Sequence, residues 1–373
     1  MNSSEIKLLV FLTRGGSLEL WARKGIIARE IQLYEEIQEF GISTTLLTYG
    51  NASEKKYAEL NRELRVKFNT FNLPLRVYEK AIPLLQCNEI LNAQVVKTNQ
   101  MNGAVTALGA ARLWRKPLIA RCGYMWSLNL ARSIGYESPE SVYARKVESK
   151  VFSQSSVNVL TTQEMVDDVK ERILDPSDCV VIPNFVDINR FKPDNAIRKD
   201  TDVLFVGRIS KEKNLVSLTK SFKGTKYTLK IIGDGDKSDL FDNDAHELGD
   251  RVNWVKYVEH ALIANYMNQA RIFVLPSLYE GHPKALLEAM ASGMAVIGAD
   301  SPGINNVIIH GETGWLCGTR PENFRQSINE LLNKPELMSR LGENARQFVR
   351  ANYSLSAIGR TEAELIRRVV EEN

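Results

Sequence analysis

The sequence has few cysteines, no long apolar run and little net charge, and each lack excludes a class of protein. The four cysteines (Cys87, Cys122, Cys179 and Cys317) stand far apart without a Cys-x-x-Cys pair, which argues against a disulfide framework and a zinc site. No apolar run approaches the roughly 18–20 residues of a membrane-spanning helix. A net charge of +3 over 373 residues lacks the basic stripe of a nucleic-acid binder. We therefore expect a cytoplasmic protein with no nucleic-acid partner.

Apolar runs that are typical of buried strands alternate with helical patterns along both halves of the chain. Strands are predicted at residues 6–12, 43–50, 93–100, 117–123, 156–162 and 179–187, and again at 202–210, 227–235, 251–258, 271–277 and 295–300. Repeated βα units with short loops predict doubly wound parallel sheets. Residues 188–201 are polar and lack periodicity, so we interpret them as a linker. The prediction is an α/β protein with two Rossmann-like domains facing a cleft, at residues 1–187 and 188–352.

The stretch LYEGHPKALLEAMASG, residues 278–293, carries the first candidate site. Glu280 follows a predicted strand, at the carboxyl end where open α/β sheets bind their ligands. Pro283 suits the first position of the following helix, and Gly293 suits the residue after its end. The N–H groups of that helix N-terminus form an anion site. They belong to Gly281, His282, Lys284 and Ala285.

A second carboxylate, Glu288, lies within this apolar helix, about 7–8 Å along the axis from Pro283. A buried carboxylate is costly unless it is paired or hydrogen-bonded. A nucleotide sugar offers ribose hydroxyls to Glu288, a diphosphate to the N–H groups and sugar hydroxyls to Glu280. The alternative is a surface pair between Lys284 and Glu288 at i, i+4.

Two further stretches place cations and glycines at strand ends. In FVGRISKEKN, Arg208 and Lys213 follow a strand and could clamp a diphosphate; two solvated loop cations are the alternative. In IIGDGDK, Gly233 and Gly235 allow a backbone to approach a nucleotide closely. A plain turn explains the same glycines equally well.

Together these stretches resemble the donor domain of the retaining glycosyltransferases of family 4, which have the GT-B fold. The shared features are GRISKEKN, IIGDG, the paired glutamates Glu280 and Glu288, GETGWL and the segment VIPNFVDINRF. Phe185 stands where the family usually has glycine. The resemblance is strong from about Val180 to Leu316 and weaker before that. It also implies that the last helix, residues 353–373, packs back on the N-terminal domain.

The resemblance assigns roles to individual residues. Glu280, Arg208 and Lys213 would be catalytic, with Glu280 on the donor sugar and the two cations neutralising the diphosphate leaving group. Glu288 would bind the ribose. The other donor-binding residues would be Gly281, His282, Pro283, Lys284, Gly233, Gly235, Gly15 and Gly16. The Asp-x-Asp sequence at 234–236 falls in the glycine loop, so we expect no metal and no further cofactor.

The N-terminal half lacks the histidine that many members of this family carry near the reacting carbon. All four histidines stand in the C-terminal half. Arg121 or Tyr124, at the end of the strand predicted at 117–123, could take a polar role on the acceptor side. The alternative is that Arg121 is an ordinary loop cation.

The expected activity is that of a metal-independent, hexosyl-type retaining glycosyltransferase with a nucleotide-sugar donor. By analogy its acceptor is a glycan or lipid-linked glycan of surface-polysaccharide synthesis in the cell envelope. Residues 112–136 interleave basic and aromatic side chains, which suits peripheral contact with the inner face of the plasma membrane; a buried strand beside a solvated helix is the alternative. A nucleotide-sugar 2-epimerase of the same fold and a non-catalytic nucleotide-sugar-binding protein are the competing functions.

Overall fold

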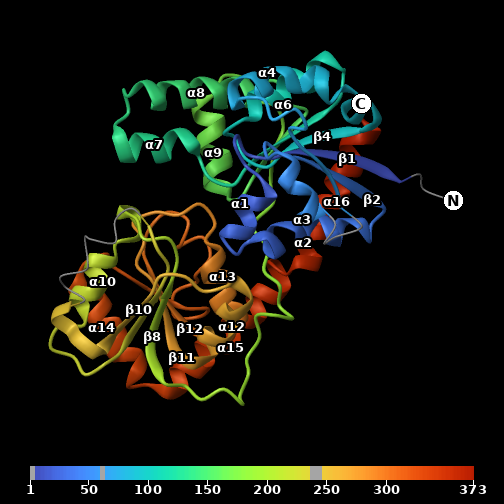
Figure 1. Ribbon diagram of the computed structural model, residues 1–373. Helices are drawn as coiled ribbons and strands as arrows, with labels where there is room; N and C mark the ends of the chain where they lie inside the picture. Colours follow the sequence, from blue (N-terminus) through green and yellow to red (C-terminus); the bar gives the residue numbers. More distant parts are fainter. Residues whose placement is uncertain (1–4, 59–63, 236–245) are drawn as a thin grey trace. The chain divides into compact units, whose positions relative to one another are not determined.

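The computed structural model describes residues 5–58, 64–235 and 246–373. The chain forms two compact units (Figure 1). Unit 1 consists of residues 1–183 and 358–373, and unit 2 consists of residues 184–357. No helix of the described residues is both long and apolar enough to cross a membrane.

Unit 1 is built on a seven-stranded sheet in the order β3-β2-β1-β4-β5-β6-β7, and every neighbouring pair is parallel. Its interior strands are largely buried and mostly apolar, as is usual for strands covered on both faces, with Lys97 and Asn158 among the buried polar exceptions. The strands are β1 (Ile6–Phe11), β2 (Ile42–Leu47), β3 (Arg65–Lys67), β4 (Val95–Thr98), β5 (Leu118–Cys122), β6 (Val157–Leu160) and β7 (Cys179–Val181).

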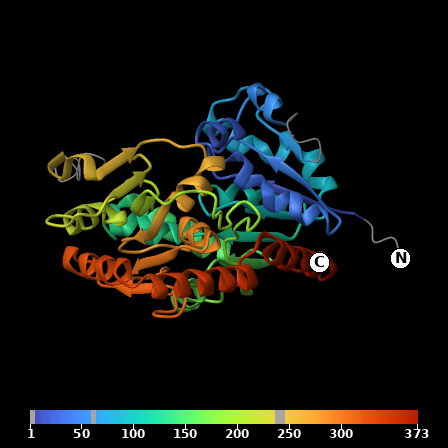
Figure 2. The ribbon, with the colours of Figure 1, turned by 90° about the horizontal axis from the view of Figure 1, so that it is seen from below.

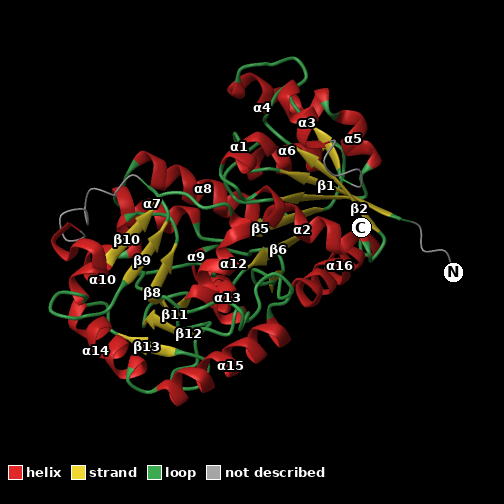
Figure 3. Ribbon diagram, turned by 60° about the horizontal axis from the view of Figure 1, so that its bottom comes forward, coloured by secondary structure: helices red, strands yellow, loops and turns green. Residues whose placement is uncertain are grey.

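Helices connect these strands and cover the sheet (Figure 3). They are α1 (Leu18–Arg23), α2 (Ile27–Gln38), α3 (Lys55–Ala58), α4 (Leu75–Leu85), α5 (Cys87–Asn92), α6 (Ala104–Leu113), α7 (Trp126–Ile134), α8 (Pro139–Phe152) and α9 (Gln163–Arg172). The helical stretch between β1 and β2 is divided into α1 and α2, because Gly25 adopts a φ of +65° between them.

The C-terminal helix α16 (Leu355–Glu371) belongs to unit 1 from Ile358 onward, which confirms the predicted return of the chain. It packs against α2, where a Cβ on Gly359 would lie 2.4 Å from Glu36 Cγ (Figure 3). Ile358, Leu365, Ile366 and Val369 form its buried apolar stripe, whereas Leu355, which the sequence also placed in this stripe, is half-buried.

Unit 2 repeats the architecture with a six-stranded parallel sheet in the order β10-β9-β8-β11-β12-β13. Its strands are β8 (Thr201–Val206), β9 (Leu229–Ile232), β10 (Val252–Val255), β11 (Ala270–Leu275), β12 (Ala295–Ala299) and β13 (Trp315–Cys317). Its helices are α10 (Leu215–Ser221), α12 (His260–Gln269), α13 (Lys284–Ala291), α14 (Pro321–Leu332) and α15 (Pro335–Asn352). The C-terminal helices α14 and α15, orange to red in Figure 2, follow each other along the chain; α14 packs against α10, whereas α15 packs against α13 and β12. Both sheets have the predicted class.

The segment that we expected to be a linker, residues 188–201, is an integral part of unit 2. Phe191 is 1% exposed within the core of this unit. Asn268 holds the segment through its side chain, which accepts from the Asp194 N–H at 2.9 Å and donates to the Lys192 carbonyl at 3.0 Å. The boundary between the units therefore lies at Pro183 and Asn184, before the polar stretch and not within it.

Candidate active site

In unit 2, the loops that follow β8, β11 and β12 are joined to one another at the carboxyl ends of these strands. The Leu278 N–H donates to the Glu212 carbonyl at 2.7 Å, and the Ser301 hydroxyl donates to the Ser277 carbonyl at 2.7 Å. The Glu280 N–H donates to the Pro302 carbonyl at 2.9 Å. Backbone contacts between loops therefore set the position of the Glu280 loop.

Lys213 and Glu280 form an ion pair between two of these loops. Lys213 Nζ lies 2.5 Å from Glu280 Oε1, and the Ser277 hydroxyl donates to the same oxygen at 2.6 Å. The side chains are 17% and 12% exposed. The structure thus brings together two of the three residues that were predicted to be catalytic. An ammonium and a carboxylate in a partly dry site can bind complementary groups of a charged ligand.

Arg208, the third predicted catalytic residue, is more exposed. Its side chain is 70% exposed and pairs with Glu212 at 3.1 Å, and the Ser210 hydroxyl donates to the same Glu212 oxygen at 2.5 Å. Burial alone would raise the pKa of Glu212, but the hydrogen bonds from Ser210 and Arg208 outweigh it and hold this pKa below its usual value. Glu212 therefore orients Arg208, a role that the sequence analysis did not identify.

Gly233 and Gly235 are required by the packing of two backbone segments. A Cβ on Gly233, whose φ is +143°, would lie 1.9 Å from the Gly207 carbonyl oxygen, and one on Gly235 would lie 2.0 Å from that of Ile209. The glycines thus bring the loops after β8 and β9 into contact. Whether they also approach a nucleotide remains a prediction, and Asp236 lies outside the described residues.

The helix α13 begins at Lys284 with Pro283 as its N-cap, one position away from the prediction, and Gly293 follows it with a φ of +72°. His282, before this N-terminus, is held by Asn184. The Asn184 N–H donates to His282 Nδ1 at 3.2 Å, and the Asn184 side-chain amide donates to the His282 carbonyl at 2.7 Å. Asn184, from the PNFVD segment, was not predicted to have a role here.

Glu288 is 4% exposed, so it does not belong to a solvated surface pair. Its Oε1 lies 2.8 Å from Nε2 of His260, the first residue of α12. No site role was predicted for His260 from the sequence. The contact joins His260 on α12 to Glu288 on α13, and the local sequence around His260 does not indicate such a contact between two helices.

In unit 1, Gly15 and Gly16 form the tight turn after β1. Gly15 has a φ of +74°, and a Cβ on Gly16 would lie 2.7 Å from the Thr13 carbonyl oxygen. The carboxylate of Glu54, which is fully buried, accepts from the N–H groups of Leu18 and Glu19 at 2.8 and 3.1 Å. This side chain therefore occupies the N-terminus of α1. The donor-binding role of Gly15 and Gly16 stays a prediction that involves the backbone of this turn.

The two residues proposed for the acceptor side differ in environment. The Arg121 side chain is 13% exposed, and its Nη1 lies 3.4 Å from Glu362 Oε1 on α16. Tyr124 is 37% exposed in the loop after β5. Arg121 is thus engaged inside unit 1, and its acceptor role remains a prediction.

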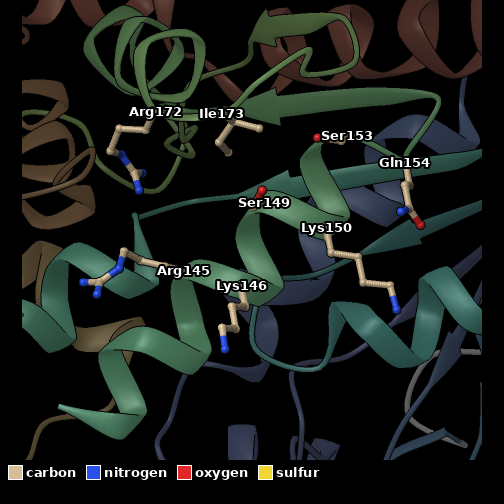
Figure 4. A pocket seen from close by; sticks show the side chains of 8 residues that line it. All are labelled: Arg145, Lys146, Ser149, Lys150, Ser153, Gln154, Arg172 and Ile173. Carbon is tan, nitrogen blue, oxygen red and sulfur yellow. The ribbon is translucent and has the colours of Figure 1, made fainter. Parts of the chain in front are cut away.

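A shallow hollow of about 650 Å³ lies over α8 and α9 and contains none of the predicted site residues. Four cations line it, and their side chains point in different directions (Figure 4). Arg172 is paired with Asp168 at 2.5 Å, and Arg145 donates to the Tyr136 carbonyl at 2.7 Å. The other two cations are Lys146 and Lys150. Diverging cations suit an extended anionic surface better than one small anion.

Two family models match the chain. "Glycosyltransferase Family 4" matches residues 31–190, and "Glycosyl transferases group 1" matches residues 187–348. The chain belongs to the family 4-type glycosyltransferases. The resemblance expected from the paired glutamates and the GRISKEKN stretch is confirmed.

Curated relatives include enzymes of different sugar chemistry. The chain is 32% identical over 177 residues to alpha-D-kanosaminyltransferase of Streptomyces kanamyceticus, and the match covers 45% of each protein. It is 25% identical over 287 residues to glycogen synthase of Mycobacterium tuberculosis, covering 73% of this chain and 68% of the synthase. The matched part is thus less than half of the kanosaminyltransferase.

Solved structures of the same fold match nearly the whole chain. Sucrose-phosphate synthase from Thermosynechococcus elongatus has a TM-score of 0.83 at 17% identity, covering 99% of this chain and 100% of that one. HepE of Anabaena, solved in complex with UDP and glucose, has a TM-score of 0.78 at 16% identity, with coverage of 97% and 100%. These similarities confirm the GT-B fold.

Proposed function

We propose that this glycosyltransferase moves a hexosyl group from a nucleoside-diphosphate sugar to an acceptor hydroxyl with retention of configuration. The observation that carries the proposal is the Lys213–Glu280 ion pair, which joins the loops at the carboxyl ends of β8 and β11. The loop that contains Glu280 leads into α13, which carries Glu288. The residue roles implied by the family resemblance thus coincide with a physically coherent arrangement of charges in unit 2.

In the proposed reaction, the acceptor oxygen bonds to the anomeric carbon as the bond from that carbon to the diphosphate breaks. The acceptor proton passes to the departing phosphate oxygen, so no protein base is needed. Lys213 and Arg208 would stabilise the negative charge that develops on the diphosphate, and the N-terminus of α13 would add backbone donors. Glu280 would bind hydroxyls of the donor sugar. With two cations in this role, we propose that the enzyme needs no metal.

UDP-sugars are the first donors to test. Support comes from HepE of Anabaena, whose structures were solved with UDP and with UDP-glucose. At 17% identity, the similarity to HepE supports a shared fold but does not identify the residues that select the base and the sugar. The glycogen synthase relative is named for the synthesis of a glycan, which supports a glycan as the acceptor; a lipid-linked glycan is the second acceptor that we propose.

We also propose peripheral contact of unit 1 with an anionic membrane. Of residues 112–136, the central part forms the buried strand β5, whereas Ile134 and Tyr136 at the end are 51% and 54% exposed. Tyr143 on α8 adds a 58% exposed ring about one helical turn before Lys146. Lys146 and Lys150 of the same helix line the basic hollow over α8 and α9 (Figure 4). Exposed aromatic rings beside cations suit a membrane interface.

Incubation with a panel of UDP-, GDP- and ADP-sugars tests the function. A transferase hydrolyses its donor slowly without acceptor, keeps the sugar unchanged, and adds it to a polyprenyl-diphosphate glycan with the donor's anomeric configuration. An altered sugar in the absence of acceptor would instead identify the 2-epimerase. Binding without any turnover across donors and acceptors would favour the non-catalytic protein.

A further inference from the structure

His260 connects the buried carboxylate of Glu288 to a guanidinium from a different part of unit 2. His260 Nε2 lies 2.8 Å from Glu288 Oε1, and His260 Nδ1 lies 3.5 Å from Arg190 Nη1. Arg190 in turn lies 4.0 Å from Asp187 through its Nε. These residues come from α13, α12 and the segment before β8, so only the folded unit assembles them.

The contacts of His260 define which ring nitrogen carries the proton. A guanidinium can only donate, so Nδ1, which faces Arg190, is the acceptor. The proton of the neutral ring is therefore on Nε2, where it donates to Glu288. The Glu288 oxygen that faces His260 is thereby fixed in position by a donor.

Burial makes this contact significant. His260 is 9% exposed and Glu288 is 4% exposed, and a carboxylate in such a place is costly without hydrogen bonds. The ring of Phe191 packs on His260 with 5.5 Å between centroids, which restrains the imidazole. The carboxylate is therefore held in one orientation before any ligand arrives.

A single segment, residues 184–191, supports both the N-terminus of α13 and Glu288 within it. Asn184 holds His282 at the start of this helix, and Arg190 and Phe191 hold His260, which contacts Glu288. The Asp187 carboxylate accepts from the Arg190 N–H at 3.1 Å and orders the turn between them. The segment thus holds both the N-terminus and the buried carboxylate of α13, the helix to which donor-binding residues were assigned.

We infer that His260 is a positioning residue that orients Glu288 to accept hydrogen bonds from the ribose hydroxyls of the donor, with Arg190 fixing the required His260 tautomer. The inference rests on the proposed function, since it assigns the nucleotide ribose to Glu288. It predicts that the preference of the protein for ribose over deoxyribose depends on His260, which contacts no ligand itself.

The experiment measures calorimetric affinities for UDP, GDP and ADP and for their 2′-deoxy analogues. The wild-type protein should prefer the ribonucleotide by about tenfold or more, the size of one hydrogen bond to a charged group. His260→Phe keeps the ring packing but removes the donor, so the preference should fall towards one. His260→Gln retains an amide donor and should keep most of the preference. His246→Phe, at an exposed histidine of the same unit, is the matched control.

The outcomes separate the two proposals. If the wild-type protein binds none of the diphosphates, the proposed function fails. If it binds them but His260→Phe keeps the ribose preference, or weakens both forms equally, His260 does not position Glu288. A wild-type protein that binds both forms equally would overturn the ribose assignment. Should His260→Phe fail to fold, as judged by circular dichroism, Arg190→Met supplies the test through the same ratio.

Discussion

Lys97 on β4 and Glu362 on α16 form an ion pair in the interior of unit 1, with 2.5 Å between Nζ and Oε2. Their side chains are 1% and 0% exposed. Arg121 adds a second cation at 3.4 Å from the other Glu362 oxygen. The pair joins residues 265 positions apart in the sequence and fixes the returning C-terminal helix on the sheet.

Removing one member of this pair should be strongly destabilising. Glu362→Ala leaves a buried ammonium without its partner, which costs about 3–5 kcal/mol in comparable pairs. The double variant Lys97→Met with Glu362→Leu removes both charges and should recover most of that loss. Urea unfolding followed by circular dichroism measures the effect. Glu364→Ala, at an exposed position of the same helix, should change little, and equal losses in the single and double variants would contradict the prediction.

The same pair should contribute to acid sensitivity. Burial opposes the ionisation of Glu362, but Lys97 and Arg121 outweigh it and hold the pKa of Glu362 below its usual value. The folded state therefore binds fewer protons than the unfolded state, so this stabilisation is present above the unfolded pKa of about 4.3 and is lost as the pH falls through the lower folded value. Between pH 6 and pH 3, the urea concentration at the unfolding midpoint should fall less steeply with decreasing pH in the double variant than in the wild-type protein. If the unfolding midpoints of the two proteins fell equally steeply with decreasing pH, the pair would not account for the acid sensitivity.

The sequence predicted most of the fold because buried parallel strands leave long apolar runs. The two strands that it missed, β3 (Arg65–Lys67) and β13 (Trp315–Cys317), are three residues long and lie at sheet edges, where no apolar run is required. Glu362 was also missed, since a charge inside an apolar stripe can be interpreted only when its partner on another element is known.

The candidate site was predictable where it is local in the chain. Glu280 and Glu288 share one motif with a fixed spacing, and Lys213 lies in another. His260 and Asn184 act through contacts with residues 28 and 98 positions away, and no local pattern marks such contacts. The linker prediction was wrong for a related reason. Residues 188–201 are polar, but hydrogen bonds between the Asn268 side chain and their backbone and the buried ring of Phe191 hold them in unit 2.

Substitution of the two cations should separate their roles. Lys213→Ala removes the partner of Glu280 and should lower kcat by about 10²–10³-fold, as the loss of one group that stabilises the transition state does. Arg208→Ala should have a smaller effect, because that side chain is 70% exposed and solvent screens its charge. Steady-state kinetics with saturating donor provide the measurement. Lys211→Ala, at an exposed lysine of the same turn, is the control, and wild-type turnover in Lys213→Ala would refute the proposed clamp.

Metal removal should leave the activity intact. In the proposed mechanism Lys213, Arg208 and the N-terminus of α13 stabilise the leaving diphosphate. Initial rates measured after dialysis against EDTA should therefore equal those measured with added magnesium or manganese. A loss of activity that either ion restores would show that a metal shares this role.

Membrane contact should depend on the charge of the lipid. Each lysine near an anionic surface contributes about 1 kcal/mol, so Lys146→Glu with Lys150→Glu should lower partitioning to vesicles rich in phosphatidylglycerol by at least about tenfold. Sedimentation with these vesicles, compared with phosphatidylcholine vesicles, gives the partition coefficient. Tyr143→Ser should reduce the part of the binding that survives high salt, because the ring contributes apolar contact and not charge.

The control for this prediction reverses two charges elsewhere on the surface. Arg340→Glu with Arg360→Glu changes the net charge by the same amount at exposed positions outside the basic hollow. This variant should retain most of the binding, because local attraction decays within about 10 Å at 0.1 M salt. Equal loss in both variants would mean that net charge alone attracts the protein. Absence of binding by the wild-type protein to anionic vesicles would refute the membrane proposal while leaving the transferase assignment unaffected.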